Sequence, residues 1–409
     1  MLATLIPLFD DKMSVSAYSL FSQKENMFIN PSLRGTGMYD GVGNIDGIDI
    51  IKSLGIETID DTADIFVSVN HISLFTDIAS QCGENTPKNR IVLLMDNTVL
   101  PDEKYVSRIK ELKEAGFKLA IRKLKVSDFE PYKAIISQLD YILLDNQKID
   151  IAKAKIYFSK VYPNISLCAI NVESQEIYDK LVADGGYKLY EGPFYRLPIT
   201  KGASEVAPLK INYIELLNIV NDPDFDLTKA ADIIGRDTAL VVKLLQMVNR
   251  MSVNSEITSI RHAAAMLGQK ELKKWINTAV TNQLCSDKPS EITRVSLLRA
   301  KFAENLAPLF GLGGQTSELF LMGLFSVIDI ILDMTMEEAL KKVKVSKTIE
   351  NALVNNTGEF ADILNFIISY ESAEWTSVDR IVLLNNIDSA ALYDAYNSSL
   401  EWFRDLFRN

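Results

Sequence analysis

The chain has 409 residues, a length at which two folded domains are expected rather than one. Hydrophobic residues make up 47% of the sequence, which is typical of a globular protein and excludes disorder as its main state. The net charge of −11 argues against a protein that binds nucleic acid or an anionic membrane surface, because both need clustered positive charge.

The three cysteines, Cys82, Cys168 and Cys285, are widely separated and do not have the spacing of a metal site. Their small, odd number is typical of a protein kept in a reducing compartment. The sequence has no run of about 18 apolar residues, and its N-terminus lacks the pattern of a signal peptide. We therefore expect a cytoplasmic protein.

The first half of the chain alternates between strand-like and helix-like segments. Leu2–Phe9 and Ser14–Phe21 flank Asp10-Asp11-Lys12, a pattern typical of a β-hairpin. The later strands begin roughly 20–27 residues apart, the size of a βα unit, so a parallel α/β barrel is predicted. These strands are expected at Ile65–Val69, Arg90–Met95, Phe117–Ile121, Tyr141–Asp145 and Ile165–Ile170.

After Pro198 the pattern becomes almost wholly helical. Asp226 and Asp237 each precede an apolar stripe of helical period, as helix N-caps do. The small, polar residues Thr200–Ser204 indicate a linker, so we expect a barrel domain at 1–200 and a helical domain at 201–409. The seam around Lys201–Leu209 is a candidate for coupling domain orientation to the binding of a partner.

Short motifs in both halves match those of a known bacterial family. Leu5–Asp10 followed by Ala17–Phe21 is similar to an opening "QPIFD … YELLF" pattern, and Tyr190–Phe194 is similar to a closing "QGYYF" pattern. Asn221-Asp222-Pro223 and Ile257–Ala263 are similar to helical-domain motifs. In this order, the motifs resemble proteins that join an EAL-type cyclic di-GMP phosphodiesterase barrel to an HDOD domain. The resemblance implies a TIM-like (β/α) barrel followed by an all-helical domain related to HD-type metal phosphohydrolases.

The resemblance also places the catalytic positions of the EAL barrel on residues of different chemistry. The tandem metal-binding aspartates correspond to Arg122 and Lys123, and the glutamate that names the motif corresponds to Ser19. Carboxylates remain at three positions, Asp96, Asp145 and Glu173. The other positions of that site fall on Ser68, Leu93, Leu143, Ile170 and Glu191.

Neither metal centre of such a family is expected to form here. Phosphodiester hydrolysis in this fold needs two metal ions held by several carboxylates, and two cations repel Mg²⁺. We expect the remaining carboxylates to form salt bridges with Arg122 and Lys123 instead. In the helical domain, the His-Asp dyad corresponds to Ser326 and Val327, and the whole chain has only His71 and His262. No metal and no other cofactor is predicted.

The favoured hypothesis is a non-enzymatic signal-transduction regulator or adaptor that acts through contacts with unidentified signalling proteins. A second hypothesis is a metal-independent receptor for cyclic di-GMP or another nucleotide, with Arg122 and Lys123 at the barrel mouth contacting phosphate. An active phosphodiesterase is the least favoured. The C-terminal segment Ala390–Phe407 has an apolar stripe that caps the helical domain or forms a homodimer surface, and the pattern does not choose between them.

Overall fold

The structure is a computed structural model that describes residues 2–23, 26, 28, 45–83, 86–200, 206, 208–222, 224–251 and 257–407. The chain folds into two compact units. The first comprises Met1–Leu197, Pro308–Gly311 and Asn365–Asn409, and the second comprises Pro198–Ala307 and Leu312–Leu364. The division expected from the sequence assigned everything after residue 200 to the helical domain. The structure instead groups the last helices with the barrel.

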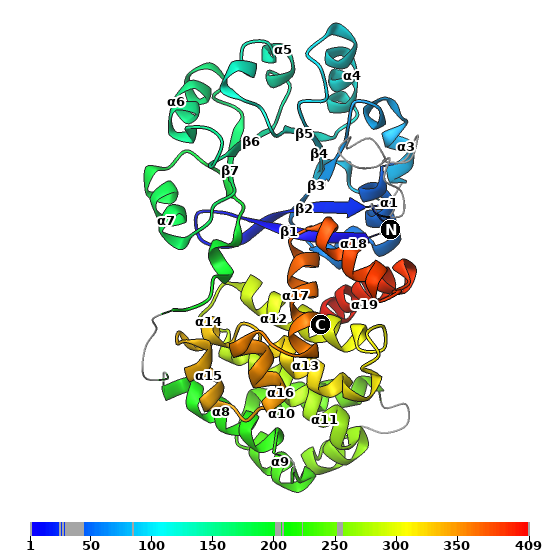
Figure 1. Cartoon of the computed structure of the whole chain (residues 1–409), viewed down its shortest axis with the longest axis vertical. Coiled ribbons are helices and arrows are strands. Elements are labelled where there is room, and N and C mark those ends of the chain that lie inside the picture. The colour runs from blue at the N-terminus through cyan, green and yellow to red at the C-terminus, as the bar shows by residue number, and fades with distance from the viewer. Residues whose placement is uncertain are drawn as a thin grey trace. The chain divides into compact units, whose positions relative to one another are not determined.

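The first unit is built on a closed eight-stranded barrel whose strands follow one another in chain order (Figure 1). β1 is antiparallel to both of its neighbours, and β2 to β8 run parallel, so the predicted hairpin and parallel barrel are confirmed. The strands are β1 (Leu2–Phe9), β2 (Val15–Gln23), β3 (Asp64–Ser68), β4 (Ile91–Met95), β5 (Lys118–Ile121), β6 (Tyr141–Asp145), β7 (Ser166–Ile170) and β8 (Leu189–Tyr190).

Helices cover the outside of the barrel between successive strands (Figure 1). Polar N-caps start several of them: the side chain of Asp102 accepts a hydrogen bond from the Tyr105 N–H, and that of Ser174 accepts one from Ile177. The helices are α1 (Asp46–Leu54), α2 (Ile56–Ile59), α3 (Ile78–Cys82), α4 (Glu103–Glu114), α5 (Lys133–Ile136), α6 (Ile151–Val161) and α7 (Gln175–Asp184).

Side chains that alternate along the strands fill the barrel interior. They form one buried cluster of Leu8, Ala17, Phe66, Val92, Leu94, Ala120, Tyr141, Leu143, Cys168 and Leu189. Because successive strand residues point to opposite faces, the positions two residues further along several strands also face inward, at the C-terminal mouth of the barrel. These positions hold polar residues in this chain, at Ser19, Ser68, Asp96, Arg122, Asp145 and Glu191.

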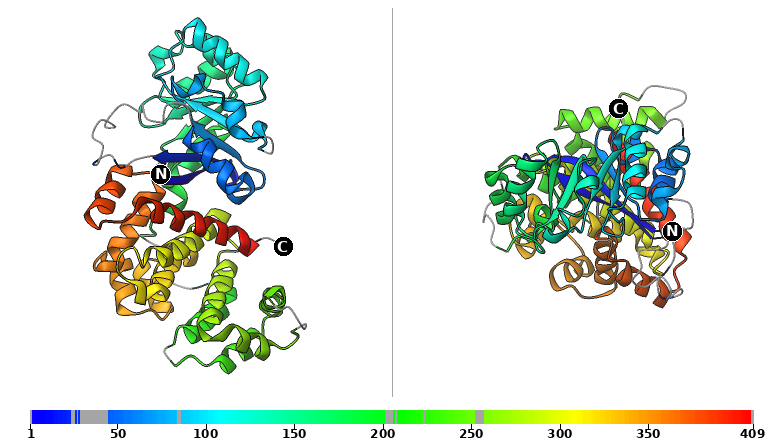
Figure 2. Two further views of the ribbon diagram at one scale, coloured as in Figure 1. Left: turned by 90° about the vertical axis from the view of Figure 1, so that its right-hand side faces the viewer. Right: turned by 90° about the horizontal axis from the view of Figure 1, so that it is seen from above.

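Three C-terminal helices contribute to the first unit, namely the end of α17 (Glu359–Glu371), α18 (Trp375–Leu384) and α19 (Ser389–Phe407). The Tyr370 hydroxyl, fully buried, accepts a hydrogen bond from the Ala3 N–H of β1 at 3.3 Å. Gln23, at the end of β2, donates to both carboxylate oxygens of the buried Asp379 at 2.8 and 2.9 Å. Both further views show α19 beside the strand β1 (Figure 2). The helix α19 contains the segment Ala390–Phe407, which we expected to cap the helical domain or form a dimer surface. It packs on the barrel instead.

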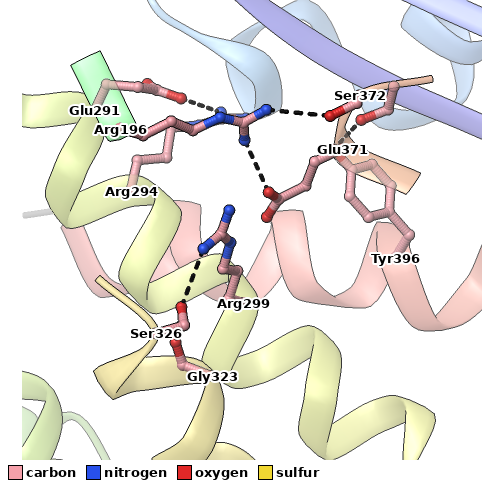
Figure 3. Close-up of polar contacts among 10 residues, drawn as sticks. Arg196, Glu291, Arg294, Arg299, Gly323, Ser326, Glu371, Ser372 and Tyr396 are labelled. Atoms are coloured by element: carbon pink, nitrogen blue, oxygen red, sulfur yellow. Dashed lines mark hydrogen bonds and ion pairs between the residues drawn. The ribbon is translucent and has the colours of Figure 1, made fainter. Parts of the chain in front are cut away.

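The Arg196 side chain ties the end of the barrel chain to the same C-terminal helices. Its guanidinium lies 2.9 Å from the Glu371 carboxylate and donates to the Ser372 hydroxyl at 3.3 Å (Figure 3). Both members of the ion pair are less than one-fifth exposed, so solvent screens the pair only weakly. The barrel unit is therefore assembled from two distant stretches of sequence.

The second unit is wholly helical in its described residues. Asp237 caps α10 by accepting hydrogen bonds from the N–H groups of Ala239 and Leu240, as the sequence predicts. α12 is buried on nearly every side. The helices are α8 (Pro208–Val220), α9 (Leu227–Ile234), α10 (Thr238–Met251), α11 (Ile260–Leu284), α12 (Ser290–Leu306), α13 (Thr316–Phe325), α14 (Ile328–Leu332), α15 (Met336–Lys342) and α16 (Lys347–Glu350).

Two further expectations from the sequence concern the linker between the domains and the absence of a membrane-spanning helix. The seam around Lys201–Leu209 falls largely outside the described residues. Within the described part of the chain, none of the helices combines the length and the apolar character needed to cross a lipid bilayer.

Candidate functional site at the barrel mouth

Arg122 occupies the mouth of the barrel, one residue beyond the end of β5. Its guanidinium donates to the Ser68 hydroxyl of β3 at 3.3 Å and lies 5.2 Å from the ring centroid of Phe21 on β2. Its Nε is buried and has no hydrogen-bond partner among the described residues. Burial lowers the pKa of Arg122, and the negative charges of Glu191 and Asp96 oppose that shift. The hydrogen bonds and charges around Arg122 therefore satisfy its guanidinium only in part.

Glu191 and Ser19 are two further polar residues at the mouth. Burial raises the pKa of Glu191 to about 7, with the charge of Arg122 opposing the rise and that of Asp145 adding to it. The Ser19 side chain is buried, and its hydroxyl has no partner within the described structure. A mouth with an unpaired Nε and an unpaired hydroxyl has free capacity for hydrogen bonds to a ligand.

The remaining carboxylates are bound to neighbouring protein groups. Lys123 lies 3.1 Å from Asp96, so this one of the expected salt bridges is present. Lys123 itself has a positive φ of 64°, and its side chain is about half exposed. Burial would raise the pKa of Asp96, but hydrogen bonds from Thr98 and Lys123 outweigh it and lower that pKa.

Asp145 and Glu173 take partners that the sequence did not suggest. Asp145 lies 3.0 Å from Lys148, and Glu173 accepts a hydrogen bond from Gln147 at 2.6 Å. Burial would raise the pKa of Asp145, yet hydrogen bonds from Asn171, Lys148 and the Gln147 N–H lower it. Asn171 has a left-handed φ of 58°, a conformation that asparagine adopts more readily than most residues. An asparagine directly after a strand was therefore the one sequence feature that could have indicated the turn that places it beside Asp145.

The apolar candidates at the mouth differ in direction. Leu143 belongs to the buried interior cluster, and Ile170 packs against it, so both face into the barrel. Leu93 does not: the interior positions of β4 are Val92 and Leu94, and alternation turns Leu93 to the outer face. The sequence matches Leu93 to a position of the EAL catalytic site, but its side chain points away from the barrel axis, because it follows one inward strand residue and precedes another.

These residues do not fit a pair of Mg²⁺ ions. Mg²⁺ requires near-octahedral oxygen ligation, and Arg122 places a positive charge among the carboxylates that would have to supply it. Asp96 and Asp145 are each bound to a lysine. Among the described residues, no three His, Cys, Asp or Glu side chains lie close enough together to hold a metal ion.

The second candidate site lies between α12 and α14 in the helical unit. Ser326 accepts a hydrogen bond from Arg299 at 3.2 Å and donates to the Gly323 carbonyl at 2.7 Å (Figure 3). Val327 is buried in the core. The buried Asp329 accepts a hydrogen bond from the Ile199 N–H, and burial raises its pKa while backbone hydrogen bonds and the charge of Arg299 oppose the rise. Arg299 and Asp329 were missed as members of this site, although both are charged residues in apolar helical stretches.

Comparison with known proteins identifies this helical unit. Residues 207–362 match the HDOD domain family. The chain contains an HDOD domain. Protein YuxH of Bacillus subtilis is 26% identical over 409 residues, covering 98% of this chain and 97% of that protein. The cyclic di-GMP phosphodiesterase CdgJ of Vibrio cholerae is 25% identical over 329 residues, covering 79% of this chain and 75% of that protein.

Solved structures with an EAL domain are similar to the barrel half of the chain. They include the YkuI protein of Bacillus subtilis, at 13% identity over 47% of this chain and 53% of that chain, with a TM-score of 0.35. A standalone EAL protein of Vibrio cholerae matches at 16% identity over 47% of this chain and 90% of its own, with a TM-score of 0.37. The predicted order, a closed (β/α) barrel followed by an all-helical HDOD domain, is confirmed.

Proposed function

We propose that this protein is a non-catalytic, cytoplasmic signal-transduction regulator that acts through contacts with other signalling proteins. The observation that carries the proposal is the position of Arg122, whose guanidinium lies among Ser68, Phe21 and Glu191 at the barrel mouth. Two-metal phosphodiester hydrolysis would need carboxylates at such positions. A scaffold that keeps its fold while its reactive groups are replaced is suited to work through its surfaces.

The HDOD domain supports the same proposal by a separate route. At the positions of the His-Asp dyad, Ser326 is hydrogen-bonded to Arg299 and Gly323, and Val327 is part of the core. A buried side-chain network of this kind holds helices together and offers no ligand for a metal ion. CdgJ carries the name of a phosphodiesterase, and we propose that this chain has departed from that activity.

A second candidate function is favoured by the unpaired groups of the barrel mouth. Arg122 Nε and Ser19 Oγ are buried donors without partners in the described structure, and a phosphate oxygen of a cyclic dinucleotide would supply the acceptor that the Arg122 guanidinium lacks. This would make the barrel a metal-independent receptor for cyclic di-GMP or a related nucleotide. Lys123, the other cation that the sequence suggested for phosphate contact, already forms an ion pair with Asp96.

Incubation of the purified full chain with cyclic di-GMP and Mg²⁺ or Mn²⁺, followed by chromatography, tests both candidates. We expect the nucleotide to be recovered intact. Calorimetric titration of the same mixtures then separates the two functions, with Arg122→Met as the test variant. Lys125→Met serves as its matched control, because Lys125 is an exposed cation on the same loop.

Each outcome has a distinct meaning. Heat that saturates in the wild type and in the Lys125 variant, but is lost in the Arg122 variant, would establish the receptor. Absence of heat with intact nucleotide would leave the regulator that acts through protein contacts. Metal-dependent formation of a linear dinucleotide would overturn both candidates.

A further inference from the structure

A group of lysines in the HDOD domain lines a small pocket that neither candidate function uses. Lys273 and Lys274 of α11 lie about one helical turn after Lys270, and all three line the pocket. Ser317 and Phe320 of α13 and Glu304 of α12 complete much of its wall. The space inside is about 50 Å³. This cluster of cations is notable in a chain whose net charge is −11.

The one carboxylate in the wall, Glu304, offsets the charge of only one of these three lysines. Glu304 is already bound by Lys274 at 2.6 Å and by Lys301 at 2.8 Å. Burial would raise the pKa of Glu304, but hydrogen bonds from Lys274 and Lys301 lower it. The carboxylate is therefore ionised and fully engaged, and the pocket keeps an excess of positive charge.

Lys273 carries much of that excess. It is partly buried and forms no ion pair within the described residues, unlike Lys274 beside it. Burial lowers the pKa of Lys273, while the charges of Glu318 and Asp222 oppose the shift without contacting the ammonium directly. A partly buried ammonium without a counter-ion is unfavourable, and an anion bound in the pocket would remove that cost.

Two helix starts lie at the same pocket. α13 begins at Thr316, its N-cap Gln315 makes no side-chain capping bond, and Ser317 lies in its first turn. α11 is interrupted at Gly268, whose φ of 74° is not helical, so Lys270 lies in the first turn of the helical segment that follows. The first N–H groups of a helix have no intrahelical partners and carry partial positive charge, which favours anions.

We infer that this pocket binds a single phosphate group through Lys270, Lys273 and Ser317. A volume of about 50 Å³ is close to that of two water molecules, which admits one small tetrahedral anion but no nucleotide base. A dianionic phosphate accepts hydrogen bonds in several directions, and so matches two ammonium groups, a hydroxyl and the helix starts. This inference concerns the HDOD domain alone and does not depend on the function proposed for the barrel.

Calorimetric titration of the full chain with inorganic phosphate, at constant ionic strength, tests the inference. We expect saturable binding that Lys273→Met weakens about tenfold, the loss of one charge-assisted interaction. Lys243→Met is the matched control, because it removes an exposed cation from α10 of the same domain, and it should leave the affinity unchanged. Absence of saturable heat, or an equal loss in both variants, would overturn the inference.

Two further measurements protect the test from a folding defect and from a general anion effect. Without phosphate, the Lys273 variant should unfold at the wild-type temperature or higher, because it loses an unfavourably placed charge. Ser317→Ala, an exposed change, should weaken phosphate binding several-fold without altering the fold. Acetate that binds as tightly as phosphate would show a site for any anion and would contradict the inference.

Discussion

The barrel mouth and the dyad position of the HDOD domain have both lost the chemistry of their resemblance, but in different ways. In the HDOD domain, Arg299 and Ser326 join a buried hydrogen-bonded group beside Asp329. In the barrel, Arg122 and Glu191 are half-buried and attract each other, and the Nε of Arg122 has no hydrogen-bond partner among the described residues. The HDOD position now stabilises the fold, whereas the barrel mouth has kept polar groups that folding does not use.

The difference has an energetic cause. A buried polar network costs little when every member is satisfied, but an unpaired donor costs about 1–3 kcal/mol. A group that keeps such a cost at the mouth of a barrel is a candidate for binding, since a ligand would supply the missing acceptor. Substitutions at the two arginines should therefore affect stability unequally.

The largest loss of stability is expected from Gly323→Ala in α13. A Cβ at this position would overlap the Arg299 carbonyl oxygen and lie 2.6 Å from the Ala300 nitrogen, so the backbones of α12 and α13 would have to separate. We expect a loss of about 3 kcal/mol in the free energy of unfolding, measured by urea denaturation. Gly314→Ala is the control, because a Cβ there meets open space. Equal stability of the two variants would contradict the close packing of the helices.

A smaller loss is expected from Arg299→Met. The change removes the hydrogen bond to Ser326 and a positive charge that, together with backbone hydrogen bonds, opposes the rise in the pKa of the buried Asp329. Breaking a buried charged network in this way should lower the free energy of unfolding by about 2–3 kcal/mol. Urea denaturation of the same preparation measures it. An unchanged free energy of unfolding would mean that Arg299 contributes no more to stability than Arg122 at the barrel mouth.

Glu191→Gln should show an effect that depends on pH. Because burial raises the pKa of Glu191 to about 7 from its ordinary 4.5, the folded protein retains a proton that the unfolded chain releases. The wild type therefore loses stability as pH rises from 4.5 to 7, and the variant does not. Thermal unfolding should show a small difference near pH 5, and the variant should be more stable by about 3 kcal/mol near pH 8. A difference that is constant with pH would exclude the raised pKa.

The smallest change in stability is expected from Arg122→Met. Its guanidinium makes one hydrogen bond at 3.3 Å, its Nε has no partner in the described structure, and burial disfavours its charge. An apolar side chain of similar length should change the free energy of unfolding by less than about 1 kcal/mol. A loss as large as that of Arg299→Met, measured side by side, would abolish the contrast between the two sites.

Much of the barrel could be predicted because its signals are local. The strands β3 to β7 were found from apolar β-branched runs, and Asp10-Asp11-Lys12 correctly marked the first hairpin. The error at Leu93 has the same local origin: a correspondence based on motif spacing does not specify which face of a strand a residue occupies. One residue of register moves a side chain from the interior to the outer layer.

The partners at the candidate site were harder to predict, since they come from different strands. The sequence suggested carboxylates paired with Arg122 and Lys123, and of these the structure forms the ion pair of Lys123 with Asp96. Arg122 instead meets Ser68, 54 residues away in the chain. Which side chains meet across a barrel depends on strand register and rotamer, neither of which a motif contains.

The sequence by itself determined the order of strands and helices, the replacement of carboxylates by cations and the HDOD motifs, because periodicity and residue chemistry are properties of short segments. Only the tertiary structure decided that residues 365–409 pack with the barrel and that Asp379 accepts hydrogen bonds from Gln23. It also decided that three lysines meet at one pocket of the HDOD domain. These arrangements depend on contacts between residues far apart in the chain, which form only when the whole chain has folded.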